Sequence, residues 1–329
     1  MTLNQSRLPV DREIASLSEQ LGPAPPPSDS QSLNELRDIS KQLSSRDAVM
    51  TDPNLVVSDV VIPGPRGEIT LSVITSSRTN KDAKRPGVYY IHGGGMVAGD
   101  RFMNIDMVLE SVTKLDAVIV TVEYRLAPEH PHPAPVEDCY AGLTWVGQNL
   151  ERLNIDADRL MIFGISAGGG LAAGTVLMAR DRGRPKLCAQ LISCPMLDYR
   201  NDTLSSHSFA DGLIWNRAKN LFGWKSLLGE RMESGEVSIY ASPALASDLS
   251  NLPPAYLDVG SNEVFRDEDL AYVQKLWQCG VPAEVHVWPG VPHGFEMFFP
   301  TASITKIAAQ TRTAWVRRIL DSRLPQIHL

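Results

Sequence analysis

Long apolar runs are missing from this sequence, and cysteine is scarce. No apolar run approaches the roughly 20 residues that a membrane-spanning helix requires, and the N-terminus lacks the apolar core of a signal peptide. We therefore expect a cytoplasmic protein without a membrane span. None of the cysteines forms a CxxC pair, which favours free thiols over the alternatives of two disulfides, a thiolate nucleophile or a zinc site. The four cysteines are Cys139, Cys188, Cys194 and Cys279.

Positive charge is also in short supply. The 31 Lys and Arg residues are outnumbered by 38 Asp and Glu residues, which gives a formal net charge of -7. A negative field repels phosphate backbones, so nucleic acid is not expected as a partner. The other proportions, 43% hydrophobic and 21% charged, are those of an ordinary globular protein. A chain of 329 residues can form one α/β core with an added cap.

Apolar, β-branched segments alternate with helix-like segments from residue 87 onward. This alternation predicts an α/β fold with a doubly wound, mostly parallel sheet. Two earlier β-rich segments, 55–62 and 69–74, flank a Pro- and Gly-containing turn and predict a β-hairpin. The strand candidates in the alternating part are 87–91, 117–124, 188–194, 254–260 and 283–288, together with the run that ends at Gly164.

Two segments outside this alternation are expected to form a helical cap on the core domain, 54–329. Residues 1–53 have helix-like spacing that the Pro-rich stretch 22–27 interrupts, which predicts two short amphipathic helices joined by a stiff linker. The second segment, about 202–240, is rich in aromatic residues and lies between two sheet strands. The alternatives are a loosely attached N-terminal arm for the first segment and plain core packing for the second.

The motif Gly164-Ile-Ser-Ala-Gly168 joins an apolar strand-like run to a small-residue helix pattern. In such a GxSxG turn the glycines avoid collisions with the strand and the helix, and the serine stands exposed on a strained elbow. We therefore predict that Ser166 is a nucleophile. A plain serine in a Gly-rich helix N-terminus is the alternative.

A second glycine motif, His92-Gly-Gly-Gly95, directly follows a predicted strand. Backbone N–H groups of Gly93, Gly94 and Gly95 can point together into a cavity and hold a negatively charged oxygen. The alternatives are a flexible loop and a metal site at His92. The second is disfavoured, because no further ligands stand near His92 at metal-binding spacing.

Two further residues complete a catalytic constellation in chain order. Glu263 and His293 each lie in a loop that follows a predicted strand, downstream of Ser166. The order nucleophile, acid, base is that of the α/β-hydrolase triad, and ligands bind at the carboxyl ends of strands in open α/β sheets. Two other acids are candidates for the triad, but Asp258 lies within a strand and Asp267 is expected to cap the helix that follows.

Taken together, these motifs resemble the hormone-sensitive-lipase-like (bacterial type IV, "α/β-hydrolase fold-3") carboxylesterases. The resemblance extends from about residue 54 to the C-terminus, and it implies an α/β-hydrolase fold with a helical cap. The sequence departs from the family pattern in two places. Ile165 stands where Asp is usual, and the loop Glu263-Val-Phe-Arg-Asp267 stands where Asp-Pro-Leu-Arg-Asp is usual. The matching segments are 92–95, 124–131, 164–168 and 292–295. In the segment 124–131 we expect Arg125 and Glu129 to bond to each other or to backbone.

The resemblance implies a serine carboxylesterase that hydrolyses small apolar esters with short to medium acyl chains. His293, oriented by Glu263, would take the proton of Ser166, and the N–H groups of residues 93–95 and of Ala167 would hold the oxyanion of the acyl transfer. No metal or organic cofactor is expected. The alternatives are a lactone or secondary-metabolite ester as substrate, an amide substrate, and a non-catalytic small-molecule receptor; a homodimer stays open. The expected substrate-binding side chains are Met96, Trp215 and Phe222.

Overall fold

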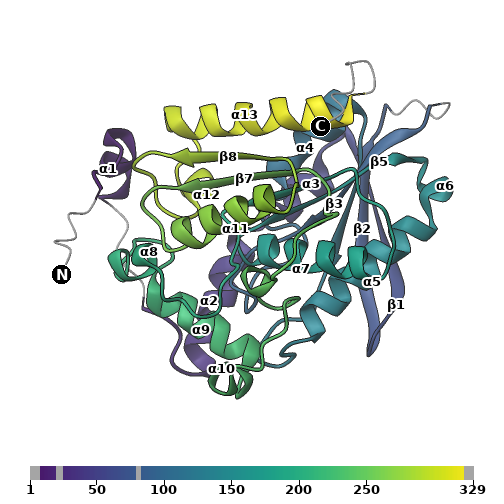
Figure 1. Ribbon diagram of the computed structural model, residues 1–329. Helices are drawn as coiled ribbons and strands as arrows, with labels where there is room; N and C mark the ends of the chain where they lie inside the picture. The colour runs from purple at the N-terminus through teal and green to yellow at the C-terminus, as the bar shows by residue number, and fades with distance from the viewer. Residues whose placement is uncertain (1–7, 20–24, 79–82, 322–329) are drawn as a thin grey trace.

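A single eight-stranded sheet forms the centre of the computed structural model, which describes residues 8–19, 25–78 and 83–321 (Figure 1). The strand order is β1-β2-β4-β3-β5-β6-β7-β8; β2 is antiparallel to both of its neighbours, and all other pairs are parallel. The predicted hairpin and the predicted, mostly parallel sheet are therefore confirmed. The strands are β1 (Leu55–Gly64), β2 (Gly67–Ser76), β3 (Arg85–Ile91), β4 (Val118–Glu123), β5 (Ile155–Ile165), β6 (Ala189–Ser193), β7 (Ala255–Gly260) and β8 (Ala283–Trp288).

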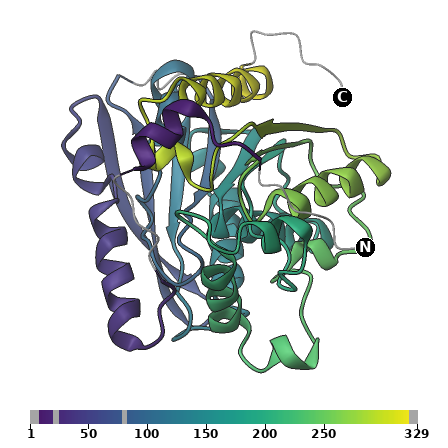
Figure 2. The same cartoon turned by 90° about the vertical axis from the view of Figure 1, so that its left-hand side faces the viewer.

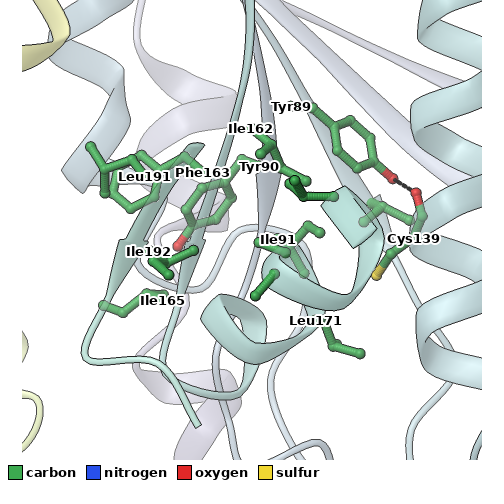
Figure 3. Close-up of a cluster of buried hydrophobic side chains, with 14 of the residues drawn as sticks. Tyr89, Tyr90, Ile91, Cys139, Ile162, Phe163, Ile165, Leu171, Leu191 and Ile192 are labelled. Carbon is green, nitrogen blue, oxygen red and sulfur yellow. Dashed lines mark hydrogen bonds between the residues drawn. The ribbon is translucent and has the colours of Figure 1, made fainter. Parts of the chain in front are cut away.

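The central strands are covered on both faces, which explains their continuous apolar sequences. Every residue of β3, β6 and β7 is buried, whereas the edge strand β1 alternates between exposed and covered positions. Figure 3 shows side chains of β3, β5 and β6 packed together with Leu171 of the following helix. The hydroxyl of Tyr89 within this cluster donates to the carbonyl of Cys139 at 2.8 Å, so its burial leaves no unpaired hydroxyl.

Helices cover both faces of the sheet (Figures 1 and 2). α4 and α13 pack against each other on one face, while α5, α7 and α11 lie on the other. Among the described residues, no helix combines the length and the apolar character needed to cross a membrane. These helices and two short ones are α4 (Asp106–Leu115), α5 (Ala134–Gln148), α6 (Leu150–Leu153), α7 (Ala167–Asp181), α11 (Arg266–Gln278), α12 (Phe295–Phe298) and α13 (Ser303–Leu320).

The remaining helices come from the two segments predicted to form the cap. In Figure 1, α2, α8 and α9 lie beyond the ends of the sheet at which the parallel strands terminate. The described part of the N-terminal segment holds three helices where we predicted two, and residues 20–24, which include the first half of the predicted linker, lie outside the described residues. The helices are α1 (Arg12–Ser18), α2 (Ser30–Gln42), α3 (Arg46–Thr51), α8 (Leu204–Ser208), α9 (Arg217–Leu228) and α10 (Arg231–Ser234).

A guanidinium group ties α2 to the core domain. Both terminal nitrogens of Arg37 donate to the carboxylate of Glu129 at 2.7 Å, and its Nε donates to the carbonyl of Val97 at 2.8 Å. These hydrogen bonds lower the pKa of Glu129 to about 2. The expected partnership between Arg125 and Glu129 is wrong, because Arg125 instead pairs with the fully buried Asp138 of α5 at 2.8 Å. The α2 helix is thus bonded to the loop that follows the glycine motif.

Candidate active site

Ser166 stands on a sharp turn between β5 and α7. Its backbone has φ 56° and ψ -121°, a conformation that costs a non-glycine residue about 1–3 kcal/mol. The turn brings α7 so close to β3 that a Cβ at Gly168 would come within 2.2 Å of the carbonyl oxygens of Ile91 and His92. Only glycine fits there, so the sequence motif encodes the elbow that we predicted.

The structure brings the three predicted catalytic side chains into one hydrogen-bonded chain. The Oγ of Ser166 lies 2.9 Å from Nε2 of His293, and Nδ1 of His293 lies 3.0 Å from Oε2 of Glu263. The Glu263 side chain is 1% exposed. Its burial raises its pKa, and the facing His293 opposes this effect. An imidazole bonded in this way to a carboxylate presents Nε2 to the serine as an acceptor.

The two other candidate acids bond to groups other than His293. Our expectation that Asp267 caps its own helix is wrong, because its carboxylate accepts from the backbone N–H of Ser205, in the first turn of α8, at 2.7 Å. Asp258 accepts from the Ser193 hydroxyl at 2.6 Å and from the indole N–H of Trp288 at 3.3 Å. Neither acid is hydrogen-bonded to His293 among the bonds of the described residues. The geometry therefore singles out Glu263 as its carboxylate partner.

The glycine motif presents backbone donors beside the serine. Gly94 and Gly95 have φ values of +104° and +63°, which turn the chain sharply after β3. Within the described part of the chain, the N–H groups of Gly94, Gly95 and Ala167 donate to no acceptor. An ideal Cβ on Gly93 would lie 3.4 Å from that of Ser166, so the loop runs directly past the elbow. Unoccupied N–H groups here can stabilise a negative oxygen.

The side chains of His92 and Tyr124 bond to backbone carbonyls of the glycine loop. The rings of His92 and Tyr124 stack with centroids 4.2 Å apart. The Tyr124 hydroxyl donates to the carbonyls of His92 and Gly93 at 3.0 and 3.2 Å, and His92 Nδ1 lies 2.8 Å from the Gly93 carbonyl. Sequence reasoning recorded Tyr124 only as part of the family segment 124–131 and missed this supporting role.

An apolar cavity of about 230 Å³ opens over the serine. Ile165, the residue before the nucleophile, contributes to its wall, so an apolar side chain stands where the related family usually has Asp. Helix α2, which belongs to the segment that we predicted to form part of the cap, contributes a row of side chains that we had not named individually. The lining includes Leu36, Ile39, Ser40, Leu43, residues 93–95, Asn104, Ile165, Ser166, Leu213, Ile214, Trp215, Lys219, Glu263, His293 and Met297.

Of the three predicted substrate-binding side chains, the structure places one in the cavity wall. The indole ring of Trp215 lies over Gly95, where a Cβ would come within 2.3 Å of it, and its centroid is 6.4 Å from that of His293. Met96 is fully buried and Phe222 packs against the main core, and neither is among the lining residues. The positive φ of Gly95 and of Met96 turns the Met96 side chain under the loop and toward α7.

All four cysteines are free thiols, as we predicted, and one lies beside the candidate triad. Ligand atoms of Cys194, Glu263 and His293 lie within 4.8 Å of one another, which is the one such group that could hold a metal ion among the described residues. Burial raises the pKa of Cys194 well above its usual value and so disfavours the thiolate that a metal requires. Zinc prefers thiolate and neutral imidazole, and here the imidazole already bonds to Ser166 and Glu263.

Asp269, one turn into α11, is a buried acid without a hydrogen-bond partner for either carboxylate oxygen among the described residues. Burial and the neighbouring Glu268 raise its pKa well above the usual value. The folded state therefore binds a proton more tightly than the unfolded state, and stability falls as the pH rises from about 4 through the raised pKa.

Asp269→Asn should accordingly stabilise the protein at pH 8, by ~1–3 kcal/mol, because the amide does not titrate and so removes the loss of stability that arises when the unfolded chain ionises more readily than the folded one. The gain should shrink as the pH is lowered toward 5, which thermal unfolding at a series of pH values can follow. Glu236→Gln, a change of an exposed acid, is the matched control. A gain that is the same at every pH would contradict the charge argument.

Comparison with known proteins places these features among esterases. A family model described as the alpha/beta hydrolase fold matches residues 88–297. The chain is 34% identical over 265 residues to "Esterase LipI" of Mycobacterium tuberculosis, covering 79% of each chain. It is 33% identical over 215 residues to "Carboxylesterase NlhH" of the same organism, covering 65% of this chain and 67% of that one. The solved structure of "Bacterial Heroin Esterase" superposes with a TM-score of 0.88 at 35% identity, covering 95% of this chain and 98% of that one.

Proposed function

The chain belongs to the hormone-sensitive-lipase-like branch of the α/β-hydrolase fold family, and on that basis we propose that it is a serine carboxylesterase that works through an acyl-enzyme. The observation that carries the proposal is the hydrogen-bonded chain from Ser166 through His293 to Glu263, with distances of 2.9 and 3.0 Å. These three side chains line an apolar cavity and lie beside backbone N–H groups that have no acceptor among the described residues. Relatives named as esterases agree with this reading.

The reaction begins with proton transfer from the Ser166 hydroxyl to Nε2 of His293. The serine oxygen attacks the ester carbonyl carbon, and the carbonyl oxygen becomes an oxyanion that the N–H groups of Gly94, Gly95 and Ala167 hold. The imidazolium, stabilised by Glu263, then protonates the leaving alcohol as its bond to the carbonyl carbon breaks. Water enters, gives a proton to the same imidazole and attacks the acyl-enzyme, which releases the acid and regenerates Ser166.

The cavity favours small esters with short to medium acyl chains. Its wall is mostly apolar. Part of that wall comes from α2 and from the segment before α9, which includes Trp215. We attribute the cap role to these parts of residues 1–53 and 202–240, which limit the length of chain that fits and exclude water from the acyl-enzyme. A lactone or a secondary-metabolite ester fits the same chemistry.

A p-nitrophenyl ester series from acetate to decanoate, with a lactone panel and the matching p-nitroanilides, tests the proposal. Esters with short to medium chains should have the largest kcat/KM, and anilides should react far more slowly, since an amine is a poorer leaving group. Turnover of anilides alone would indicate an amidase. Tight binding of a small molecule without turnover of any ester would indicate a receptor.

Trp215→Ala should change the relative kcat/KM across this chain-length series, because it removes the indole ring that lies over Gly95 in the cavity wall. We expect the longer chains to gain relative to acetate by about tenfold, the lower end of what one methylene group in a hydrophobic pocket contributes to discrimination. The matched control is Trp277→Ala, which alters a half-exposed indole on α11 that is not among the residues lining the cavity. A uniform change across all chain lengths would assign Trp215 to ordinary packing.

A further inference from the structure

Lys219 places a buried ammonium group in the cavity wall. It lies in the first turn of α9, is 9% exposed, and is one of the lining residues. Its Nζ donates to the backbone carbonyl of Ile214, which also lines the cavity, at 2.8 Å. An ammonium group has three N–H donors, so this bond satisfies one of them.

Lys219 has no acidic partner, whereas the other buried cations of the described residues each have one. Among the described residues, its Nζ forms no ion pair with a carboxylate, and burial, with no acid to oppose it, lowers its pKa. In the described part of the chain the three other buried cations each face an acid: Arg85 faces Asp116 at 4.0 Å, Arg101 faces Asp59 and Glu123 at 2.8 Å, and Arg312 faces Glu296 at 2.6 Å. A buried ammonium group without an anion is unfavourable, because burial removes hydration that no opposite charge replaces.

The position of Lys219 in its helix is also unfavourable for a cation. It is the third residue of α9, where the backbone N–H groups already create a positive field. The helix is capped by Asn216, whose side chain accepts from the Lys219 backbone N–H at 3.0 Å, and an ammonium group, which only donates, adds nothing to that cap. A buried lysine that has no acid partner, stands in the first turn of a helix and lines a cavity is typical of a functional position.

We propose that Lys219 binds a carboxylate carried by the substrate, so that the preferred substrates are esters with a second, ionised acid group. This inference rests on the proposed esterase function. The ammonium group and the N-terminal field of α9 act on the same anion, and the apolar lining around them strengthens the attraction by excluding water. The acids in the wall do not compete for Lys219, because Glu296 and Asp258 face Arg312 and Glu263 bonds to His293.

The test compares acids with their uncharged amides at equal length. Monoethyl esters of the straight-chain dicarboxylic acids from succinate to suberate, and ω-acetoxy carboxylates of similar length, place the carboxylate on the acyl or the alcohol side of the ester. Each is assayed beside its ω-amide with the wild type, Lys219→Met and Lys219→Arg. In at least one series the wild type should favour the acid, and Lys219→Met should lower the acid-to-amide ratio of kcat/KM by about ten- to a hundredfold. Lys219→Arg should restore part of that ratio.

A purely structural role would lower kcat/KM for acids and amides in parallel and leave their ratio unchanged, which would overturn the proposal while the esterase function stands. A second readout does not depend on catalysis. Calorimetric titration of Ser166→Ala with the best acid and its amide should show tighter binding of the acid, and adding Lys219→Met should remove that preference. If no ester were hydrolysed by the wild type, the esterase proposal would fail, and this titration would still decide whether Lys219 binds the carboxylate.

Discussion

Ser166→Ala should abolish ester hydrolysis, with kcat lower by about 10⁶-fold, while the protein stays folded. The hydroxyl carries the covalent step, and its partner in the structure is His293 Nε2 at 2.9 Å. Its loss leaves only substrate binding and the oxyanion donors to accelerate the reaction. Alanine also fits the elbow without a clash, since the space around the serine side chain is open to the cavity. Initial rates with p-nitrophenyl butyrate and thermal unfolding measure the two effects separately.

A second serine in the same cavity provides the control. The hydroxyl of Ser40 on α2 donates to the carbonyl of Leu36 in its own helix, and Ser40→Ala should therefore keep most of the activity. A fluorophosphonate should label the wild type and Ser40→Ala at Ser166, and it should not label Ser166→Ala. Labelling at another residue, or substantial activity in Ser166→Ala, would remove the nucleophile from the mechanism.

The sheet could be predicted because its strands are buried on both faces. Such strands need apolar residues at every position, so β3, β6 and β7 appear in the sequence as short uninterrupted apolar runs. The elbow could be predicted for a related reason: the close approach of α7 to β3 leaves room only for glycine at position 168. In both cases a local requirement, either burial or lack of space, restricts which residue types can occupy the position, so the sequence reveals it.

The cavity wall could be predicted only in part, because it depends on how distant segments meet. The spacing in α2 indicated an apolar face that belongs to the cap, but nothing local indicated which of its side chains line the cavity or that Arg37 bonds to Glu129, 92 positions later. Met96 follows the glycine motif directly, yet the backbone turn sends its side chain toward α7. Lys219 looked like an ordinary helix residue, since its burial and its lack of an acid partner exist only in the folded chain.

Glu263→Gln should lower kcat by about 10⁴-fold, the loss seen when the corresponding acid of a serine protease becomes an amide. The amide keeps the shape of the side chain but removes the charge that stabilises the imidazolium, and it can present an N–H group to His293 and so reverse the tautomer. Neither water nor a neighbouring group can replace the lost charge, because Glu263 is almost fully buried and its second oxygen, Oε1, has no partner among the described residues. Rates at saturating p-nitrophenyl butyrate, with thermal unfolding as the measure of folding, give the effect on catalysis.

Asp267→Asn is the matched control for this acid assignment. The Asp267 carboxylate accepts from the backbone of Ser205 at 2.7 Å and from Arg266 at 2.8 Å, so it joins α11 to the start of α8. Its replacement should cost about 1 kcal/mol of stability through the lost cap and have little effect on kcat. The family's usual acid loop begins with Asp where this chain has Glu263, and the longer glutamate still reaches Nδ1 of His293 at 3.0 Å. A well-folded but inactive Asp267→Asn, beside an active Glu263→Gln, would shift the catalytic acid from the loop to the helix and require a rearranged site during turnover.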